Sequence, residues 1–192
     1  MNEAALLIVD LQNDFCPGGA LPVPDGDKIV PIINDLISIA VGRNMPILAS
    51  KCWHPSDTTH FNTHGGPWPP HCIKTTKGAE LHPDLKIPKN PILIYKCTKP
   101  NEDAYSAFDG KDRTGKTLLE ILQNTKTEIL WICGFATDYC VKATALDAKK
   151  YGFNIWVFKN ACAAVNINPS DGKKSIEEME QVGIKVLSLG IW

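Results

Sequence analysis

The chain has 192 residues, of which 44% are hydrophobic and 21% charged, and this composition excludes an intrinsically disordered protein. With 20 basic and 21 acidic side chains the net charge is −1, so the balance predicts neither a nucleic-acid partner nor binding to an anionic membrane. No apolar run is long enough for a signal or membrane segment, and seven cysteines without a C-x-x-C pair argue against a secreted disulfide framework. We therefore expect a single globular domain, residues 1–192, in the reducing cytoplasm.

Short apolar, β-branched runs alternate with helical patterns along the chain, which is typical of an α/β fold. The first expected strand covers residues 5–10, and a helix with apolar residues at helical spacing follows at 28–41. In chain order, the remaining expected elements are strands at 46–51 and 91–96, a helix at 117–122, a strand at 128–133, a helix at 138–151, a strand at 153–158, a helix at 173–182 and a strand at 185–189. Six strands joined by crossovers predict a three-layer αβα fold around a six-stranded, mostly parallel sheet.

One segment, about residues 52–91, interrupts this alternation. It is rich in proline, glycine, histidine and tryptophan and holds all five histidines of the chain. A stretch of this length without regular structure is usually functional.

Polar residues follow three of the expected strands. Asp10 ends the first strand, Lys96 ends the third, and the fourth leads to Cys140. Because parallel sheets bind ligands at the carboxyl ends of their strands, we expect an acid, an amine and a thiol to meet at one edge of the sheet.

Cys140 has a physical basis for reactivity. If Thr137 is the N-cap of the helix that follows, Cys140 lies in the first turn, near the positive end of the helix dipole, and Lys96 nearby would favour the thiolate further. Asp10 would then accept the thiol proton and deliver it to a leaving group. The alternative is a small buried apolar residue, and position alone favours neither interpretation.

A metal site is a second hypothesis. Cys52 and His54 are two residues apart, so in an extended segment they share a face, and the rigid loop before His71 could return that side chain to them. Three such ligands and an open fourth position describe a catalytic metal site. The alternative is that these histidines are simply solvated.

Residues 110–117 match the Walker A phosphate loop letter for letter. That loop needs a strand directly before it, and here the preceding segment is polar. A lysine-rich turn that enters a helix is the favoured interpretation, and a nucleotide-binding protein is kept as a rival.

Aromatic side chains also gather near the expected strand ends. Phe15, Trp53, Trp68 and Tyr105 either cover the core there or form a pocket for a flat aromatic substrate.

Several segments together resemble a known family. They are residues 7–15 (LIVDLQNDF), 53–55 (WHP), 64–72 (HGGPWPPHC), Lys96, 105–108 (YSAF) and 134–141 (GFATDYCV). They occur in order over nearly the whole chain and resemble the nicotinamidase branch of the isochorismatase-like cysteine hydrolase family, which also includes pyrazinamidases.

The resemblance implies an Asp10–Lys96–Cys140 triad. Cys140 would attack the carboxamide of nicotinamide to form a thioester, and Asp10 would pass its proton to the departing ammonia and then activate water. It also implies an oxyanion hole from the backbone N–H groups of Ala136 and Cys140, beside a cis peptide at Phe135–Ala136. Two such donors are worth ~10²–10³ in rate each.

The resemblance further implies one divalent metal that binds the pyridine nitrogen, with a pocket for this small substrate formed by Phe15, Trp68 and Tyr105. Family members are often homo-oligomers and act in NAD salvage. One position departs from the family pattern, because Cys52 stands where an aspartate is usual. We expect Cys52, His54 and His71 to be the ligands and the softer thiolate to favour zinc. In the alternative Cys52 does not bind and the site is weak or missing.

Two further rivals remain. The chain could be another amidase or an isochorismate hydrolase of the same fold, or an interaction domain without catalytic activity.

Overall fold

The structure, a computed structural model, describes residues 3–190. Six strands form one sheet: β1 (Ala4–Val9), β2 (Ile47–Cys52), β3 (Ile92–Lys96), β4 (Ile129–Phe135), β5 (Asn154–Ala163) and β6 (Lys185–Leu187). The α-helices of the described chain are α1 (Val30–Gly42), α2 (Leu118–Asn124), α3 (Lys142–Lys150) and α4 (Asp171–Gln181). Each expected strand and helix is therefore present, with ends that differ by a few residues.

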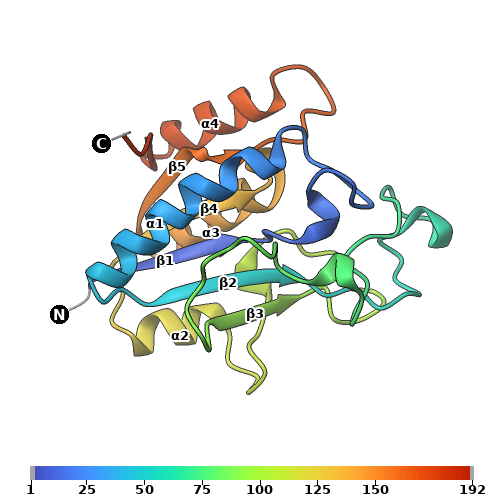
Figure 1. The fold of residues 1–192 in the computed structure, drawn as a ribbon, viewed down its shortest axis with the longest axis horizontal. Coiled ribbons are helices and arrows are strands. Elements are labelled where there is room, and N and C mark those ends of the chain that lie inside the picture. Colours follow the sequence, from blue (N-terminus) through green and yellow to red (C-terminus); the bar gives the residue numbers. More distant parts are fainter. Residues whose placement is uncertain (1–2, 191–192) are drawn as a thin grey trace.

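The sheet has the strand order β3-β2-β1-β4-β5-β6, and every adjacent pair is parallel. Right-handed crossovers with this order place α1 on one face and α2, α3 and α4 on the other, which gives the expected three layers (Figure 1). The chain leaves β1 toward one edge of the sheet and returns from β3 to β4 on the other side of β1. The neighbouring ends of β1 and β4 are thus the topological switch point, where α/β sheets bind ligands.

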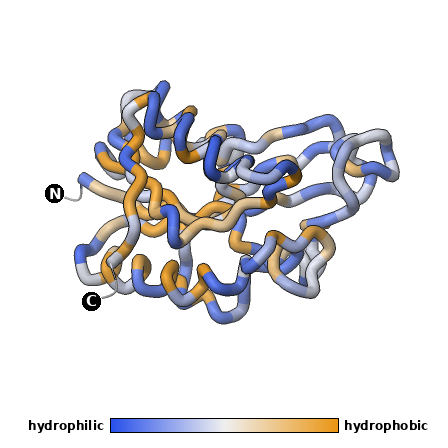
Figure 2. The backbone as a smooth tube through the Cα atoms, turned by 90° about the horizontal axis from the view of Figure 1, so that it is seen from above, coloured by the Kyte–Doolittle hydropathy of each residue, from blue (hydrophilic) through white to orange (hydrophobic). Residues whose placement is uncertain are grey.

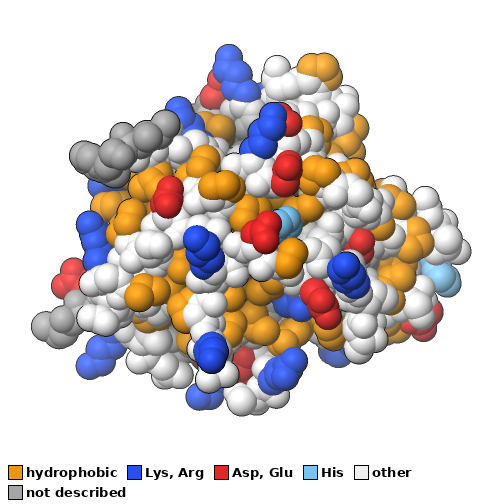
Figure 3. Space-filling view, viewed as in Figure 1, with side chains coloured by type: hydrophobic (Ala, Val, Ile, Leu, Met, Phe, Trp, Pro, Cys, Tyr) orange, Lys and Arg blue, Asp and Glu red, His pale blue; other side chains and the backbone are white. Residues whose placement is uncertain are grey.

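The core lies along the central strands. In β1, residues Ala5 to Val9 are fully buried, because helices cover both faces of a parallel sheet. Figure 2 shows the hydrophobic residues concentrated in these strands and hydrophilic residues in the loops at one end of the molecule. On the face seen in Figure 3, acidic and basic side chains are interspersed, in keeping with the small net charge.

The expected helix at 138–151 is divided. A π-helical turn, Thr137–Val141, comes before α3, and its N-cap is Ala136, without a side-chain cap. The expectation that Thr137 caps an ordinary α-helix is therefore wrong. Among the described helices, none is long and apolar enough to cross a membrane.

Candidate active site

Asp10 and Lys96 form a buried ion pair at the switch point. Asp10 follows β1 with a φ of 48°, a left-handed conformation that is uncommon outside glycine and recurs at functional sites. Lys96 ends β3, and its Nζ lies 3.0 Å from Asp10 Oδ2, with each side chain 1% exposed. Ser50 Oγ donates a hydrogen bond of 2.7 Å to Asp10 Oδ1, so both carboxylate oxygens have partners.

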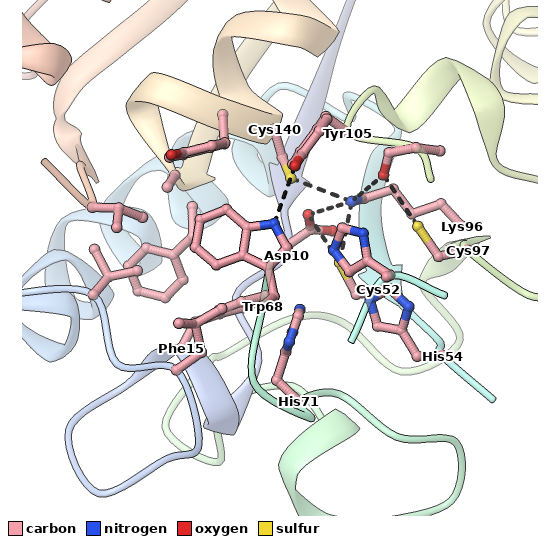
Figure 4. A pocket seen from close by; sticks show the side chains of 18 residues that line it. Asp10, Phe15, Cys52, His54, Trp68, His71, Lys96, Cys97, Tyr105 and Cys140 are labelled. Atoms are coloured by element: carbon pink, nitrogen blue, oxygen red, sulfur yellow. Dashed lines mark hydrogen bonds and ion pairs between the residues drawn. The ribbon is translucent and has the colours of Figure 1, made fainter. Parts of the chain in front are cut away.

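Cys140 contacts the same ammonium group. Lys96 Nζ lies 3.3 Å from Cys140 Sγ, and Lys96 thus bridges the acid and the thiol (Figure 4). Burial opposes the charge on Lys96, but the Asp10 carboxylate and the thiols of Cys140 and Cys52 outweigh it and raise the pKa of Lys96 well above its ordinary value. The structure therefore places a positive charge beside the Cys140 sulfur.

The backbone before Cys140 has the conformation that the resemblance implied. The Phe135–Ala136 peptide bond is cis, and Ala136 and Cys140 both line the cavity described below. The carboxylate of Asp138, in the same turn, accepts hydrogen bonds of 2.9 Å and 2.8 Å from the N–H groups of Val165 and Asn166. These bonds hold the turn that carries Cys140 against the loop between β5 and α4.

Cys52 also contacts this group of side chains. Lys96 Nζ is 3.1 Å from Cys52 Sγ, and Cys52 Sγ is 3.7 Å from Asp10 Oδ2. A hydrogen bond with Cys140 and burial raise the pKa of the Cys52 thiol well above its ordinary value. The group of described side chains that could hold a metal does not include Cys52, so the structure differs here from the expected ligand set.

Three histidines form the cluster that can hold a metal. His54, His60 and His71 are all buried, and their candidate ligand atoms lie within 4.8 Å of one another. The sequence predicts His54 and His71 in this set. The third member is His60, whereas the sequence predicts Cys52. His60 lies in the same irregular segment, six residues after His54, but nothing local distinguishes it from His64 or His82.

The environment of these imidazoles fits a metal. Both ring nitrogens of His54 are buried without a hydrogen-bond partner, which is costly unless something else occupies them. Burial lowers the pKa of His54 to about 2 and that of His71 to about 4, so both present neutral nitrogens. The Nδ1 atom of His71 is 2.7 Å from the carbonyl oxygen of Pro69. Metal-bound histidines commonly have such a partner on their second ring nitrogen, and it fixes the orientation of the ring.

An aromatic cavity lies between the triad and the histidines. The empty space within it, open solvent at its mouth included, is about 490 Å³. The expected pocket residues Phe15, Trp68 and Tyr105 line it, and Trp68 Nε1 donates a hydrogen bond of 3.1 Å to Tyr105 Oη (Figure 4). Tyr139, which the sequence did not single out, also lines it, with its ring centroid 5.2 Å from that of Trp68.

The Walker-like segment has no phosphate cradle. Asp112 Oδ1 accepts hydrogen bonds from the backbone N–H groups of Thr114 and Lys116. A bound phosphate would need these same N–H groups as donors. Thr117 and Glu120 cap α2 reciprocally. These observations favour the interpretation as a turn that enters a helix.

The site and fold agree with a known family. A model of the isochorismatase domain matches residues 4–190. The chain belongs to the isochorismatase family. Nicotinamidase of Escherichia coli is 38% identical to this isochorismatase-family chain, and the match covers 100% of this chain and 98% of that protein.

Solved structures extend the likeness to three dimensions. Pyrazinamidase of Pyrococcus horikoshii, in complex with zinc, has a TM-score of 0.90 and 42% identity over 97% of this chain and 99% of that one. A protein of L. infantum in complex with nicotinate has a TM-score of 0.84 and 34% identity over 97% and 93% of the two chains.

Proposed function

We propose that this protein is an amidase that hydrolyses nicotinamide to nicotinate and ammonia, as a step of NAD salvage, and that it also deaminates pyrazinamide. The observation that carries the proposal is the buried lysine shared by Asp10 and Cys140 in an aromatic cavity, with three buried histidines beside it. The full-length similarity to proteins that are named nicotinamidase supports the same substrate.

The reaction begins at Cys140. Asp10 accepts the thiol proton, and the thiolate attacks the carboxamide carbon, so that a C–S bond forms and the carbonyl oxygen becomes an oxyanion. Lys96, 3.0 Å from the acid and 3.3 Å from the sulfur, keeps both groups in place and balances the charge as the proton moves. The N–H groups of Ala136 and Cys140 stabilise the oxyanion.

The second half of the reaction reverses the proton transfer. Asp10 gives its proton to the amide nitrogen, the C–N bond breaks, and ammonia leaves behind a nicotinoyl thioester. Asp10 then takes a proton from water, the hydroxide attacks the thioester carbon, and the C–S bond breaks to release nicotinate and restore the Cys140 thiol.

The histidine cluster supplies orientation. A zinc ion held by His54, His60 and His71 would bind and polarise the pyridine nitrogen of the substrate. Phe15 and Trp68 line the cavity and would pack against the flat ring of the substrate.

Ammonia release from nicotinamide tests the function. Wild type should release ammonia, Cys140→Ala should not, and Cys162→Ala, which removes a thiol outside the cavity, should behave as wild type. Equal rates for wild type and Cys140→Ala would overturn the mechanism. Turnover of other amides but not of nicotinamide would favour a different amidase of this fold.

All seven cysteines are unpaired, which supports a location in a reducing compartment such as the cytoplasm. We also propose a homo-oligomer, which the mass in solution from light scattering would test.

A further inference from the structure

Two cysteine thiols contact the Lys96 ammonium group in the candidate active site, although the proposed reaction uses only one of them. Lys96 Nζ is 3.1 Å from Cys52 Sγ and 3.3 Å from Cys140 Sγ, so both sulfurs contact the same nitrogen atom. Cys52 ends β2 and Cys140 follows β4, and these strands flank β1. The sheet therefore brings together two cysteines that are 88 positions apart in the sequence.

The surroundings of this pair suit oxidation at Cys140. Its sulfur lies 3.3 Å from the Lys96 ammonium group, which balances negative charge on the sulfur as it reacts with a peroxide. Cys140 and Cys52 both line the cavity, which gives a small oxidant a route to them (Figure 4). A third cavity cysteine, Cys97, is placed differently, because its thiol donates a hydrogen bond of 3.1 Å to the carbonyl of Ala104.

We propose that Cys52 is a resolving thiol that converts an oxidised Cys140 into a reversible disulfide. A peroxide oxidises the Cys140 thiolate by two electrons to a sulfenic acid, with transfer of one oxygen and release of hydroxide. The Cys52 sulfur then attacks the sulfenic sulfur, an S–S bond forms as the S–O bond breaks, and the hydroxyl leaves as water with the Cys52 proton. A dithiol reductant restores both thiols by exchange.

The consequence is protection of the nucleophile. Without a neighbouring thiol, a sulfenic acid is oxidised further to a sulfinic acid, which thiols do not reduce. The disulfide blocks that path and holds the site inactive until it is reduced. The proposal uses the Cys140 thiol of the proposed function, but its test reads sulfur chemistry directly and needs no turnover of nicotinamide.

Peptide mapping of the wild-type protein is the primary test. After treatment with hydrogen peroxide and digestion with trypsin, fragment spectra should show residues 52–74 joined to residues 127–142. Because these peptides also contain Cys72 and Cys133, the spectra must assign the bond to Cys52 and Cys140. A protein whose Cys140 is oxidised without this bond would overturn the proposal, and so would a bond to any other cysteine.

Reversibility is the second test. Dithiothreitol should return most of the starting amidase activity to peroxide-treated wild type and to the Cys97→Ser control. Cys52→Ser, compared with its own starting activity, should regain less than about a tenth and accumulate sulfinic acid at Cys140. Dimedone, which traps sulfenic acids, should label Cys140 in Cys52→Ser even if that variant has little activity. If Cys52→Ser and wild type regain the same fraction of their activity, the proposed role of Cys52 is refuted. If untreated wild type does not hydrolyse nicotinamide, only the proposed function is refuted.

Discussion

Removal of the Lys96 ammonium group should lower the free energy of unfolding by much more than the lost packing contacts alone would. Lys96 Nζ lies 3.0 Å from Asp10 Oδ2, and both side chains are 1% exposed. Two unit charges at this distance attract by about 5.5 kcal/mol at an effective dielectric constant of about 20. Desolvation offsets much of this attraction in the intact pair, but a charge left alone in the interior keeps its desolvation cost.

Lys96→Met keeps an unbranched side chain and removes the charge. The Asp10 carboxylate then retains the hydrogen bond from Ser50 Oγ but has no counter-ion. We expect the free energy of unfolding at pH 8 to fall by about 3–5 kcal/mol, the usual cost of removing one partner of a buried pair.

The loss should be smaller at low pH. A buried carboxylate without a counter-ion favours its neutral form, so the folded variant binds a proton at a higher pH than the unfolded chain, in which aspartate titrates near ~3.9. Such a group stabilises the folded state at low pH and loses that contribution as the pH rises. In wild type, Lys96 stays charged throughout this range because its pKa is raised. The defect of Lys96→Met should therefore be smaller at pH 5 than at pH 8.

Urea unfolding, followed by tryptophan fluorescence at pH 5 and pH 8, measures these quantities. The Lys96→Met/Asp10→Asn double variant carries no buried charge at this point and should be more stable at pH 8 than Lys96→Met. The reasoning is refuted if Lys96→Met is within about 0.5 kcal/mol of wild type, or if the two substitutions are simply additive.

Three further predictions concern the histidines and the Walker-like segment. His60→Ala should lose most of its bound zinc in equilibrium dialysis, whereas Cys52→Ser should retain it, because His60 belongs to the cluster and Cys52 faces the triad. In metal-free protein, His54 and His71, with pKa values of about 2 and about 4, stay neutral when folded but bind protons when unfolded. Between about pH 6 and pH 5 each should lower the free energy of unfolding by roughly 1 kcal/mol per pH unit as the pH falls, and His54→Phe should show a shallower slope in urea titrations. Mg-ATP should leave the melting temperature unchanged, because Asp112 occupies the N–H groups of its loop.

Each of these outcomes has a clear opposite. Zinc loss in Cys52→Ser with retention in His60→Ala would restore the ligand set expected from the sequence. A slope in His54→Phe equal to that of wild type would show that His54 is protonated in the folded state. A rise in melting temperature with Mg-ATP that Lys116→Ala removes would revive the nucleotide-binding rival.

Much of the fold is encoded locally. The strands and helices follow from runs and periodicities of apolar residues, because burial on both faces demands continuous apolar strands and burial on one face demands a helical stripe. Asp10 and Lys96 were identified from their positions at strand ends, since the carboxyl ends of parallel strands meet at one edge. The resemblance added the cis peptide at Phe135–Ala136, which no local pattern indicates.

Local patterns are thus enough to predict the six strands, the α/β class and the meeting of Asp10 with Lys96 at one edge of the sheet. Which histidines cluster, and where the Cys52 side chain points, depends instead on how distant segments pack. The irregular segment has no periodicity that ties a residue to a face, so its path depends on contacts with distant strands. The two sulfurs come together for the same reason, because the strand order sets β2 and β4 on either side of β1.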